Sequence, residues 1–436
     1  MTRTGSVFAR ALGWNIGGTA AGQIAGLALN IVLARALAPT ALAAVLAGLS
    51  FAAIVSLACG IALDRVGIVA VTRDPEHRGA LAGGIVVVAA GASGVAAVVA
   101  GIGALIGGDA FPWSGSGTAV ALVALLTGAD VLRTASGELP RAWLRTGTSV
   151  VLGNAGRSVV VLVGLAVVAA TIGLDTAERA LAVFVVGSGS LAIAAVVSVH
   201  RLADGQPADP RAGLRIARGG GVVAVGSVAR AMIEQADVLV IAAAFDARAA
   251  AGYAITARVA NAVAGATAAI NLTVLPMFGR VQQRSEDGIQ NLARAGATLA
   301  SLVVVPSCLL LAIYAEPVLD LVFGDDIADA APFLRILLVG QLLNVLTGVS
   351  GAVLLDAGRH RSLLTINVVA SVAVLVGELA VLPFDDPRLV AWVNAIGFGL
   401  LNLAMLVTAR RRLGIRCETH IAPRAALHSI RTAFRP

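Results

Sequence analysis

Twelve long apolar segments divide this sequence, and they restrict the chain to a protein that crosses a membrane many times. Each is long enough for the ~20 residues that a tilted membrane-spanning helix needs. The mean hydropathy of +0.90 and the 13% of charged residues exclude a water-facing surface, because soluble domains carry about 25%. We expect spans at residues 12–34, 42–63, 80–106, 117–137, 148–173, 180–200, 219–245, 251–276, 295–315, 331–355, 362–383 and 389–409.

The distribution of arginine between the loops predicts how the chain is oriented in the membrane. All 32 of the Lys and Arg residues are Arg. With twelve spans, most of them fall on the side that holds both termini, and the opposite side holds only Arg35, Arg179, Arg248, Arg335 and Arg388. Basic residues are enriched in cytoplasmic loops, so both termini are predicted to be cytoplasmic. The Lys-free, Ala- and Gly-rich composition indicates a GC-rich bacterial genome, and hence the bacterial cytoplasmic (inner) membrane.

A faint repeat suggests two halves. The stretch "LARALAPTALAAVLAGLS" after the first span aligns with "IAAAFDARAAAGYAITAR" after the seventh, about half the chain away. We therefore predict an all-α integral membrane fold with two six-helix lobes, related by a pseudo-two-fold axis along the membrane normal. The expected lobes are residues 1–205 and 206–412, and a basic cytoplasmic tail follows at 413–436.

Charged side chains inside the predicted spans are the candidate functional residues. Each costs on the order of 2.5–3.5 kcal/mol at the centre of a lipid-exposed helix, so they are expected to face protein or water. Arg230, Glu234 and Asp237 are spaced four and three residues apart, which places them on one helix face. This stripe predicts either an ion pair that joins helices or the lining of a polar pathway.

Residues on other predicted spans lie at a similar depth in the membrane and are added to the candidate site. Asp237 and Arg258 lie at similar distances from the outer ends of the seventh and eighth spans, so we predict that they pair, with Asn261 one turn from Arg258. Arg157 is placed at mid-depth of the fifth span. The predicted substrate cavity is lined by Arg157, Arg230, Glu234, Asp237, Arg258 and Asn261. Its excess of guanidinium groups favours an anionic cargo.

Two further buried acids are candidate ion or proton sites. Glu378 lies in the outer half of the eleventh span, and Asp130 lies near the cytoplasmic end of the fourth, within reach of Arg133. No phosphate-binding loop is present, and the three cysteines are widely separated. We therefore predict no cofactor and no metal site. The arginines are spread over short loops, which argues against a nucleic-acid partner.

Several motifs resemble a known family. The stretch "EQADVLVIAAAFDARAAAGYAITARVANAV" contains Asp237, Gly252, Tyr253, Ala257 and Arg258 in the pattern of the seventh and eighth helices of polysaccharide exporters. These are the O-antigen and teichoic-acid flippases of the multidrug/oligosaccharidyl-lipid/polysaccharide flippase superfamily. "LNIVLARALAP" resembles their first helix and turn, and "INLTVLPMFGRV" resembles the end of their eighth helix. The start of the second helix departs from the family, with Ala43-Ala44-Val45 in place of a Phe-Gly-Leu-like sequence.

The resemblance implies that two lobes open alternately to each side and turn a polyprenyl-pyrophosphate-linked glycan from the inner to the outer leaflet. It further implies membrane lipids and the glycosyltransferases or polymerase of a polysaccharide pathway as partners. We expect a monomer without enzymatic activity. Two alternatives remain. One is a cation-coupled multidrug antiporter of the same fold. The other is a membrane glycosyltransferase or polymerase that uses the acidic pairs in "GDD" (324–326) and "FDDP" (384–387).

Overall fold

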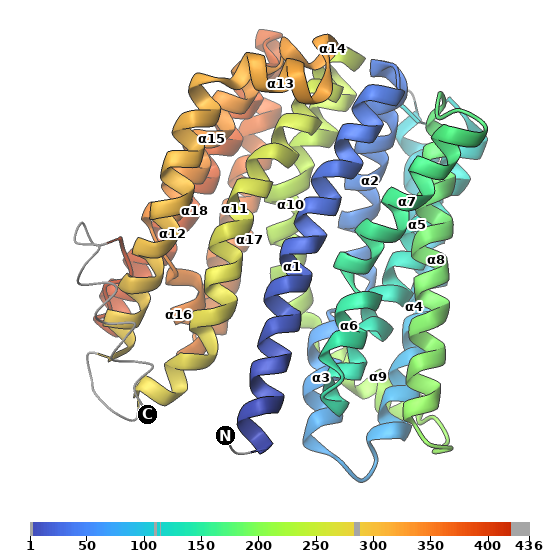
Figure 1. The fold of residues 1–436 in the computed structure, drawn as a ribbon, viewed down its shortest axis with the longest axis vertical. Helices are drawn as coiled ribbons and strands as arrows, with labels where there is room; N and C mark the ends of the chain where they lie inside the picture. Colours follow the sequence, from blue (N-terminus) through green and yellow to red (C-terminus); the bar gives the residue numbers. More distant parts are fainter. Residues whose placement is uncertain (1–2, 109–110, 114, 283–287, 420–436) are drawn as a thin grey trace. The chain divides into compact units, whose positions relative to one another are not determined.

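The computed structural model describes residues 3–108, 111–113, 115–282 and 288–419, and this part of the chain is helical without β-strands (Figure 1). Helices satisfy their own backbone hydrogen bonds, as a segment in hydrocarbon must. The first half contains α1 (Arg3–Ala36), α2 (Pro39–Cys59), α3 (Leu63–Arg73), α4 (Arg78–Gly107), α5 (Gly117–Gly137), η2 (Leu139–Trp143), α6 (Thr146–Leu152), α7 (Asn154–Thr171), α8 (Ala177–Leu202) and α9 (Pro210–Gly219). The second half contains α10 (Gly221–Ala244), α11 (Ala247–Gln282), α12 (Gly288–Ile313), α13 (Ala315–Phe323), α14 (Asp325–Ala328), α15 (Ala331–Leu346), α16 (Ser350–Asp356), α17 (His360–Val381), η3 (Leu382–Phe384) and α18 (Pro387–Leu413).

These helices confirm an all-α membrane protein. Nine segments of the described chain are long and apolar enough to cross a membrane. Two bent pairs, α9 with α10 and α15 with α16, bring the number to as many as eleven. The helix α11 covers the predicted eighth span at residues 251–276. The total of twelve stays a prediction.

Two predicted spans are interrupted, so the expectation of continuous helices there was wrong. The span at 148–173 is divided into α6 and α7 by Gly153, whose backbone is extended. A Cβ on Gly156 would lie 1.7 Å from the Val151 carbonyl oxygen, so the chain needs glycine after this break. The span at 331–355 bends by 45° between α15 and α16, where Gly348 has a φ of +70°. The hydrophobicity of these two segments does not predict either break in the helix.

The acidic segment between the ninth and tenth spans is also more ordered than predicted. The expected spans end at residue 315 and resume at residue 331, which leaves the segment between them as a loop. The structure forms α13 and α14 there instead, and buries Leu319, Phe323 and Ile327. The apolar residues between the acids give this segment its own buried face.

Internal contacts divide the chain into two compact units, Met1–Ala254 and Ile255–Pro436. We refer to them as the first and second units. The predicted lobe boundary at residue 205 stays a prediction. In the first unit α4, α5 and α8 pack together, and α1 runs alongside α6 and α7 (Figure 1). The core between α3, α4, η2 and α9 contains Leu63, Ile85, Leu139 and Ala217.

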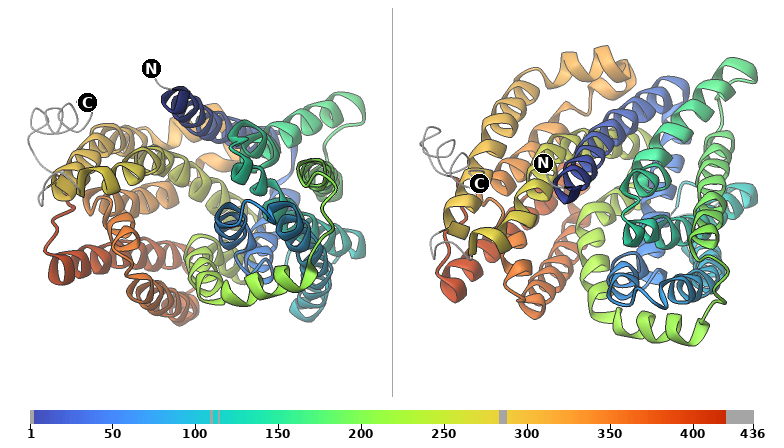
Figure 2. Two further views of the ribbon diagram at one scale, coloured as in Figure 1. Left: turned by 90° about the horizontal axis from the view of Figure 1, so that it is seen from below. Right: turned by 60° about the horizontal axis from the view of Figure 1, so that its bottom comes forward.

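The loop after the sixth span contains an unexpected helix, α9, which lies across the ends of its neighbours (Figure 2). The Asp209 carboxylate caps it by accepting a hydrogen bond from the Ala212 amide at 3.0 Å. A Cβ on Gly84 of α4 would lie 2.0 Å from the Asp209 carbonyl oxygen, and one on Gly213 would lie 2.4 Å from the Gly84 carbonyl oxygen. The two helices therefore meet backbone to backbone, and α9 is fixed against α4.

In the second unit, residues 414–419 of the predicted tail dock on α12 and on the α15–α16 bend. The Glu418 carboxylate lies 2.8 Å from Arg410 Nη2 and 3.9 Å from Arg294 Nη2. The Arg416 amide donates to Gln290 Oε1 at 2.9 Å, and the Ser301 and Thr419 hydroxyls are 2.9 Å apart. The rest of the predicted tail, residues 420–436, lies outside the described residues. These contacts fasten the end of α18 to two other helices.

We predict that this docking weakens at acidic pH. Burial raises the pKa of the Glu418 carboxyl, but hydrogen bonds and the charges of Arg410 and Arg294 outweigh burial, and the pKa lies below its ordinary value of 4.5. The ionised carboxylate therefore stabilises the docked segment above that ordinary value, and this stabilisation is lost as the pH falls through the lowered pKa. Hydrogen exchange at the Arg416 and Thr419 amides, corrected for intrinsic rates, should accelerate in that window.

The variant Glu418→Gln is expected to exchange quickly at neutral pH and to lose this pH response. The matched control is Asp356→Asn, which neutralises an exposed acid at the end of α16. If Glu418→Gln retained slow exchange and the pH response of the wild type, the carboxylate would not hold the segment.

Candidate functional site

Asp130 forms the centre of a buried ionic network in the first unit. Its carboxylate accepts from Arg133 Nε at 3.1 Å and lies 3.1 Å from Arg157 Nη2. Arg133 also donates to Asn154 Oδ1 at 3.0 Å, and Arg157 donates to Ser188 Oγ at 2.9 Å. The predicted contact between Asp130 and Arg133 is therefore present. The network links α5, α7 and α8 through charge-assisted hydrogen bonds, which are stronger than neutral ones.

The break before α7 determines where Arg157 lies. Because α7 begins at Asn154, Arg157 occupies its first turn rather than the middle of a continuous span. Its guanidinium carbon lies 5.6 Å from the centre of the Phe184 ring on α8. Arg157 thus points into the first unit, toward partners of that unit.

The sequence identified Arg133 only as a residue within reach of Asp130. In the structure its side chain is 2% exposed, inside α5. The i, i+3 spacing from Asp130 was the one local signal for this burial. Asn154 and Ser188 were not predicted at all, because they reach the network from other helices.

The helix α10 carries the predicted pair of Arg230 and Glu234. Arg230 Nε donates to Glu234 Oε1 at 2.5 Å. The two side chains are 40% and 38% exposed. An exposed ion pair within a membrane helix is expected to face water or a polar molecule rather than acyl chains. This pair keeps its guanidinium accessible to an anion.

Asp237 lies on the same helix but is buried, so the predicted stripe is not uniform. The Tyr253 hydroxyl donates to Asp237 Oδ2 at 2.5 Å, and the Val238 amide donates to Oδ1 at 2.8 Å. Nearby, the Ser50 hydroxyl of α2 donates to Gln235 Oε1 at 2.8 Å. Tyr253, fully buried in α11, is a residue that the sequence marked only through family resemblance. These bonds tie α10 to α11 and α2.

The second unit contains Arg258, Asn261 and Glu378. Gln341 Nε2 of α15 donates to Asn261 Oδ1 at 3.2 Å, and Asn344 continues this chain by donating to Gln341 Oε1 at 3.3 Å. Arg258 is half-buried one turn before Asn261. Glu378 is fully buried within α17. These amides form a polar row that runs from the buried Gln341 to the exposed Asn261.

The predicted chamber joins residues of both units. Arg157, Arg230, Glu234 and Asp237 belong to the first, and Arg258 and Asn261 belong to the second. The pairing of Asp237 with Arg258 and their shared cavity therefore stay predictions. Among the described residues, no group of three or more His, Cys, Asp or Glu side chains is placed to hold a metal ion.

Comparisons with known proteins agree with the resemblance seen in the motifs. Residues 157–332 match the family described as polysaccharide biosynthesis protein. No curated protein sequence is significantly similar to the chain.

Solved structures share the fold. One is the inward-facing conformation of a multidrug resistance MATE family transporter of the MOP superfamily (17% identity, TM-score 0.70, 90% of this chain and 94% of that one). Another is the lipid II flippase MurJ in an inward closed conformation (12% identity, TM-score 0.70, 96% and 90%). A third is a MOP superfamily transporter from Pyrococcus furiosus (15% identity, TM-score 0.59, 94% and 95%). The two-lobe fold expected from the sequence is therefore confirmed.

Proposed function

We propose that this chain is a flippase for lipid-linked oligosaccharides, because residues 157–332 match the polysaccharide biosynthesis protein family and the chain shares its fold with a solved transporter and a solved flippase. In this proposal it moves a polyprenyl-pyrophosphate-linked glycan from the inner to the outer leaflet by alternating access. The glycan then serves cell-surface polysaccharide synthesis, such as O-antigen or lipopolysaccharide. The chain performs no catalytic step.

One observation carries the proposal. The family match at residues 157–332 contains every residue of the predicted substrate cavity, and these residues include three arginines within membrane helices. A lipid-linked glycan has an anionic pyrophosphate, polar sugars and an apolar tail. Unaided crossing would strand the charged group in hydrocarbon at a cost of several kcal/mol. Guanidinium groups replace the lost hydration by bidentate hydrogen bonds to phosphate.

The same proposal specifies the membrane in which the protein acts and its partners there. The concentration of arginine on one side supports a bacterial inner membrane with both termini in the cytoplasm. The lipid-linked glycan would be delivered there by glycosyltransferases and used outside by a polymerase. The flippase is proposed to act as a monomer in contact with membrane lipids.

Purified protein in liposomes tests the cargo. A short oligosaccharide on polyprenyl pyrophosphate is placed in both leaflets, and the outer pool is removed by an added glycosidase that cannot cross. We expect the protected inner pool to disappear with wild-type protein and to persist in protein-free liposomes. A protected pool that persists with folded wild-type protein contradicts the proposal.

The antiporter alternative shares this fold, because the TM-scores to the MATE transporter and to MurJ are equal at 0.70. Ion-coupled dye transport in the same liposomes separates the two functions. Dye transport driven by a Na⁺ or proton gradient, together with an unchanged glycan pool, would assign the chain to efflux. A change in the mass of the recovered glycan would indicate a transferase or polymerase instead.

A further inference from the structure

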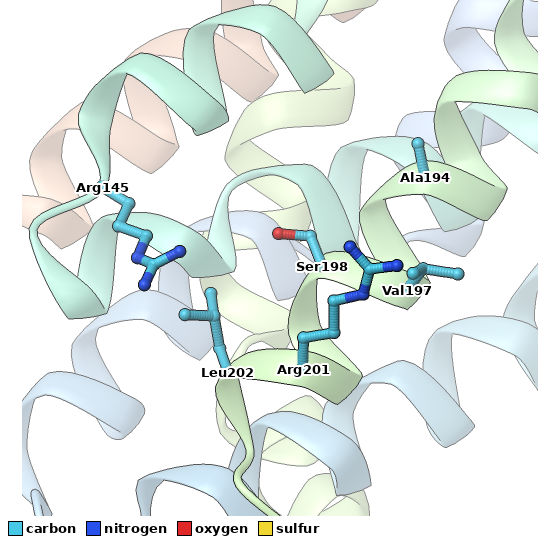
Figure 3. A pocket seen from close by; sticks show the side chains of 6 residues that line it. All are labelled: Arg145, Ala194, Val197, Ser198, Arg201 and Leu202. Atoms are coloured by element: carbon cyan, nitrogen blue, oxygen red, sulfur yellow. The ribbon is translucent and has the colours of Figure 1, made fainter.

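A basic pocket lies at the end of α8 in the first unit, away from the charges discussed above. It has a volume of about 400 Å³ and is lined by Arg145, Ala194, Val197, Ser198, Arg201 and Leu202. Arg145 reaches it from the turn between η2 and α6, and the other residues come from α8. In Figure 3 the two guanidinium groups approach from opposite sides, with Ser198 and Leu202 between them. The pocket thus presents two cations and a hydroxyl to whatever occupies it.

The polar groups of this pocket are not used elsewhere in the described structure. Arg145, Ser198 and Arg201 form no ion pair and no side-chain hydrogen bond with other described residues. The neighbouring Arg141 is different, because it lies 2.6 Å from Glu138 Oε2 and donates to Ser149 Oγ at 3.1 Å. The nearby acid is therefore already paired with another arginine. Two unneutralised charges at one pocket favour an anionic ligand.

The pocket also lies at the boundary of the membrane. Arg201 is in the last turn of the span Ala177–Leu202, and Arg145 follows the span Gly117–Trp143 by two residues. Apolar residues that adjoin two of the lining residues in the sequence are exposed. Leu144 is 76% exposed, and Ile193 is 66% exposed. At this depth a ligand's charged end would meet the arginines while its apolar part contacted these side chains.

We propose that this pocket binds the phosphate headgroup of an anionic membrane phospholipid. Two guanidinium groups and a hydroxyl supply the donors that a phosphodiester requires, and arginine is suited to phosphate because its donors form a planar fork. Basic pockets between membrane helices on the cytoplasmic side take anionic headgroups in this way. The bound lipid is distinct from the translocated cargo, and the proposal does not depend on what the cargo is.

Native mass spectrometry of the delipidated protein tests this site. Phosphatidylglycerol or phosphatidylcholine is added, and retention of each lipid is measured for the wild type and for the double variant Arg145→Gln, Arg201→Gln. We expect the wild type to retain phosphatidylglycerol preferentially, and the double variant to bind it roughly thirtyfold more weakly, since each arginine near the membrane surface contributes roughly five- to sixfold in affinity.

The matched control is Arg411→Gln, Arg412→Gln, which removes two exposed charges at the end of α18 on the same predicted side. It should bind phosphatidylglycerol like the wild type, and an equal loss in both double variants would overturn a specific site. Competition by inorganic phosphate at the same concentration as the lipid would also overturn it, because the ligand would then be free phosphate. Melting temperatures establish that the variants fold, and Arg201→Gln alone provides a second variant that should bind with intermediate affinity.

Discussion

Replacing Asp130 with Ala is expected to lower the free energy of unfolding of the first unit by about 3–5 kcal/mol, the cost of breaking a buried ion pair. Arg133 and Arg157 both lie within 3.1 Å of this carboxylate. Without it, two guanidinium groups would remain in an interior with little water to neutralise or solvate them. Unfolding of the purified protein in detergent, followed by tryptophan fluorescence, measures the change.

The control for this prediction is Asp175→Ala. Asp175 also pairs with an arginine, Arg179, but the two side chains are 69% and 41% exposed. Exposed pairs contribute about 1 kcal/mol or less, so this variant should unfold almost like the wild type. A double-mutant cycle completes the test, since Asp130→Ala should be less costly in an Arg157→Ala background. Equal losses from the buried and exposed acids would show that the network is not a principal source of stability.

Exchanging the two charges on α10, with Arg230→Glu and Glu234→Arg, is expected to leave the protein folded and to reduce glycan flipping by roughly ten- to a hundredfold. The exchange keeps an i, i+4 ion pair of the same composition. It moves the guanidinium by one turn, about 5 Å, and puts a carboxylate where the arginine is proposed to meet the cargo. The loss of one hydrogen bond to a charged group, about 1.5–3 kcal/mol, sets the magnitude. The liposome assay with the external glycosidase gives the readout.

This exchange separates the two interpretations of the pair. If Arg230 and Glu234 only stabilise α10, the reversed pair should flip glycan at the wild-type rate, and the proposed role of Arg230 would be wrong. The corresponding exchange in the exposed pair, Asp175→Arg with Arg179→Asp, controls for charge reversal at the membrane surface. That variant should retain full activity, because neither residue belongs to the predicted cavity.

The sequence predicted most of the helices because apolar runs of membrane length have few alternatives to helix. It did not predict the breaks at Gly153 and at Gly348, since these depend on close backbone contacts rather than on hydrophobicity. Helix α9 was missed for a related reason. This helix is too short and too basic to be predicted as a membrane span, and its position depends on glycine contacts with α4.

Within the candidate site, local spacing was reliable and tertiary pairing was not. The pairs of Asp130 with Arg133 and of Arg230 with Glu234 follow from their separation along one helix. The contact of Asp130 with Arg157 joins helices whose register the sequence does not encode in any simple pattern. Asp237 was predicted to meet Arg258, and the structure gives it a hydrogen bond from Tyr253. The additional contact between Arg258 and Asp237 stays a prediction.

The backbone contact between Gly84 and Gly213 has a mechanical consequence for the connection into α10. Because the backbones of α9 and α4 are in contact at these glycines, α9 passes any pull from α10 directly to α4. Freedom to turn is confined to the glycines at 219–221, where the chain bends by 58°. A Cβ on Gly220 would lie 2.6 Å from the Ile61 carbonyl oxygen, whereas the glycines on either side have open space. The change of direction between α9 and α10 therefore depends on the central glycine of these three, where a larger residue would meet the backbone at Ile61.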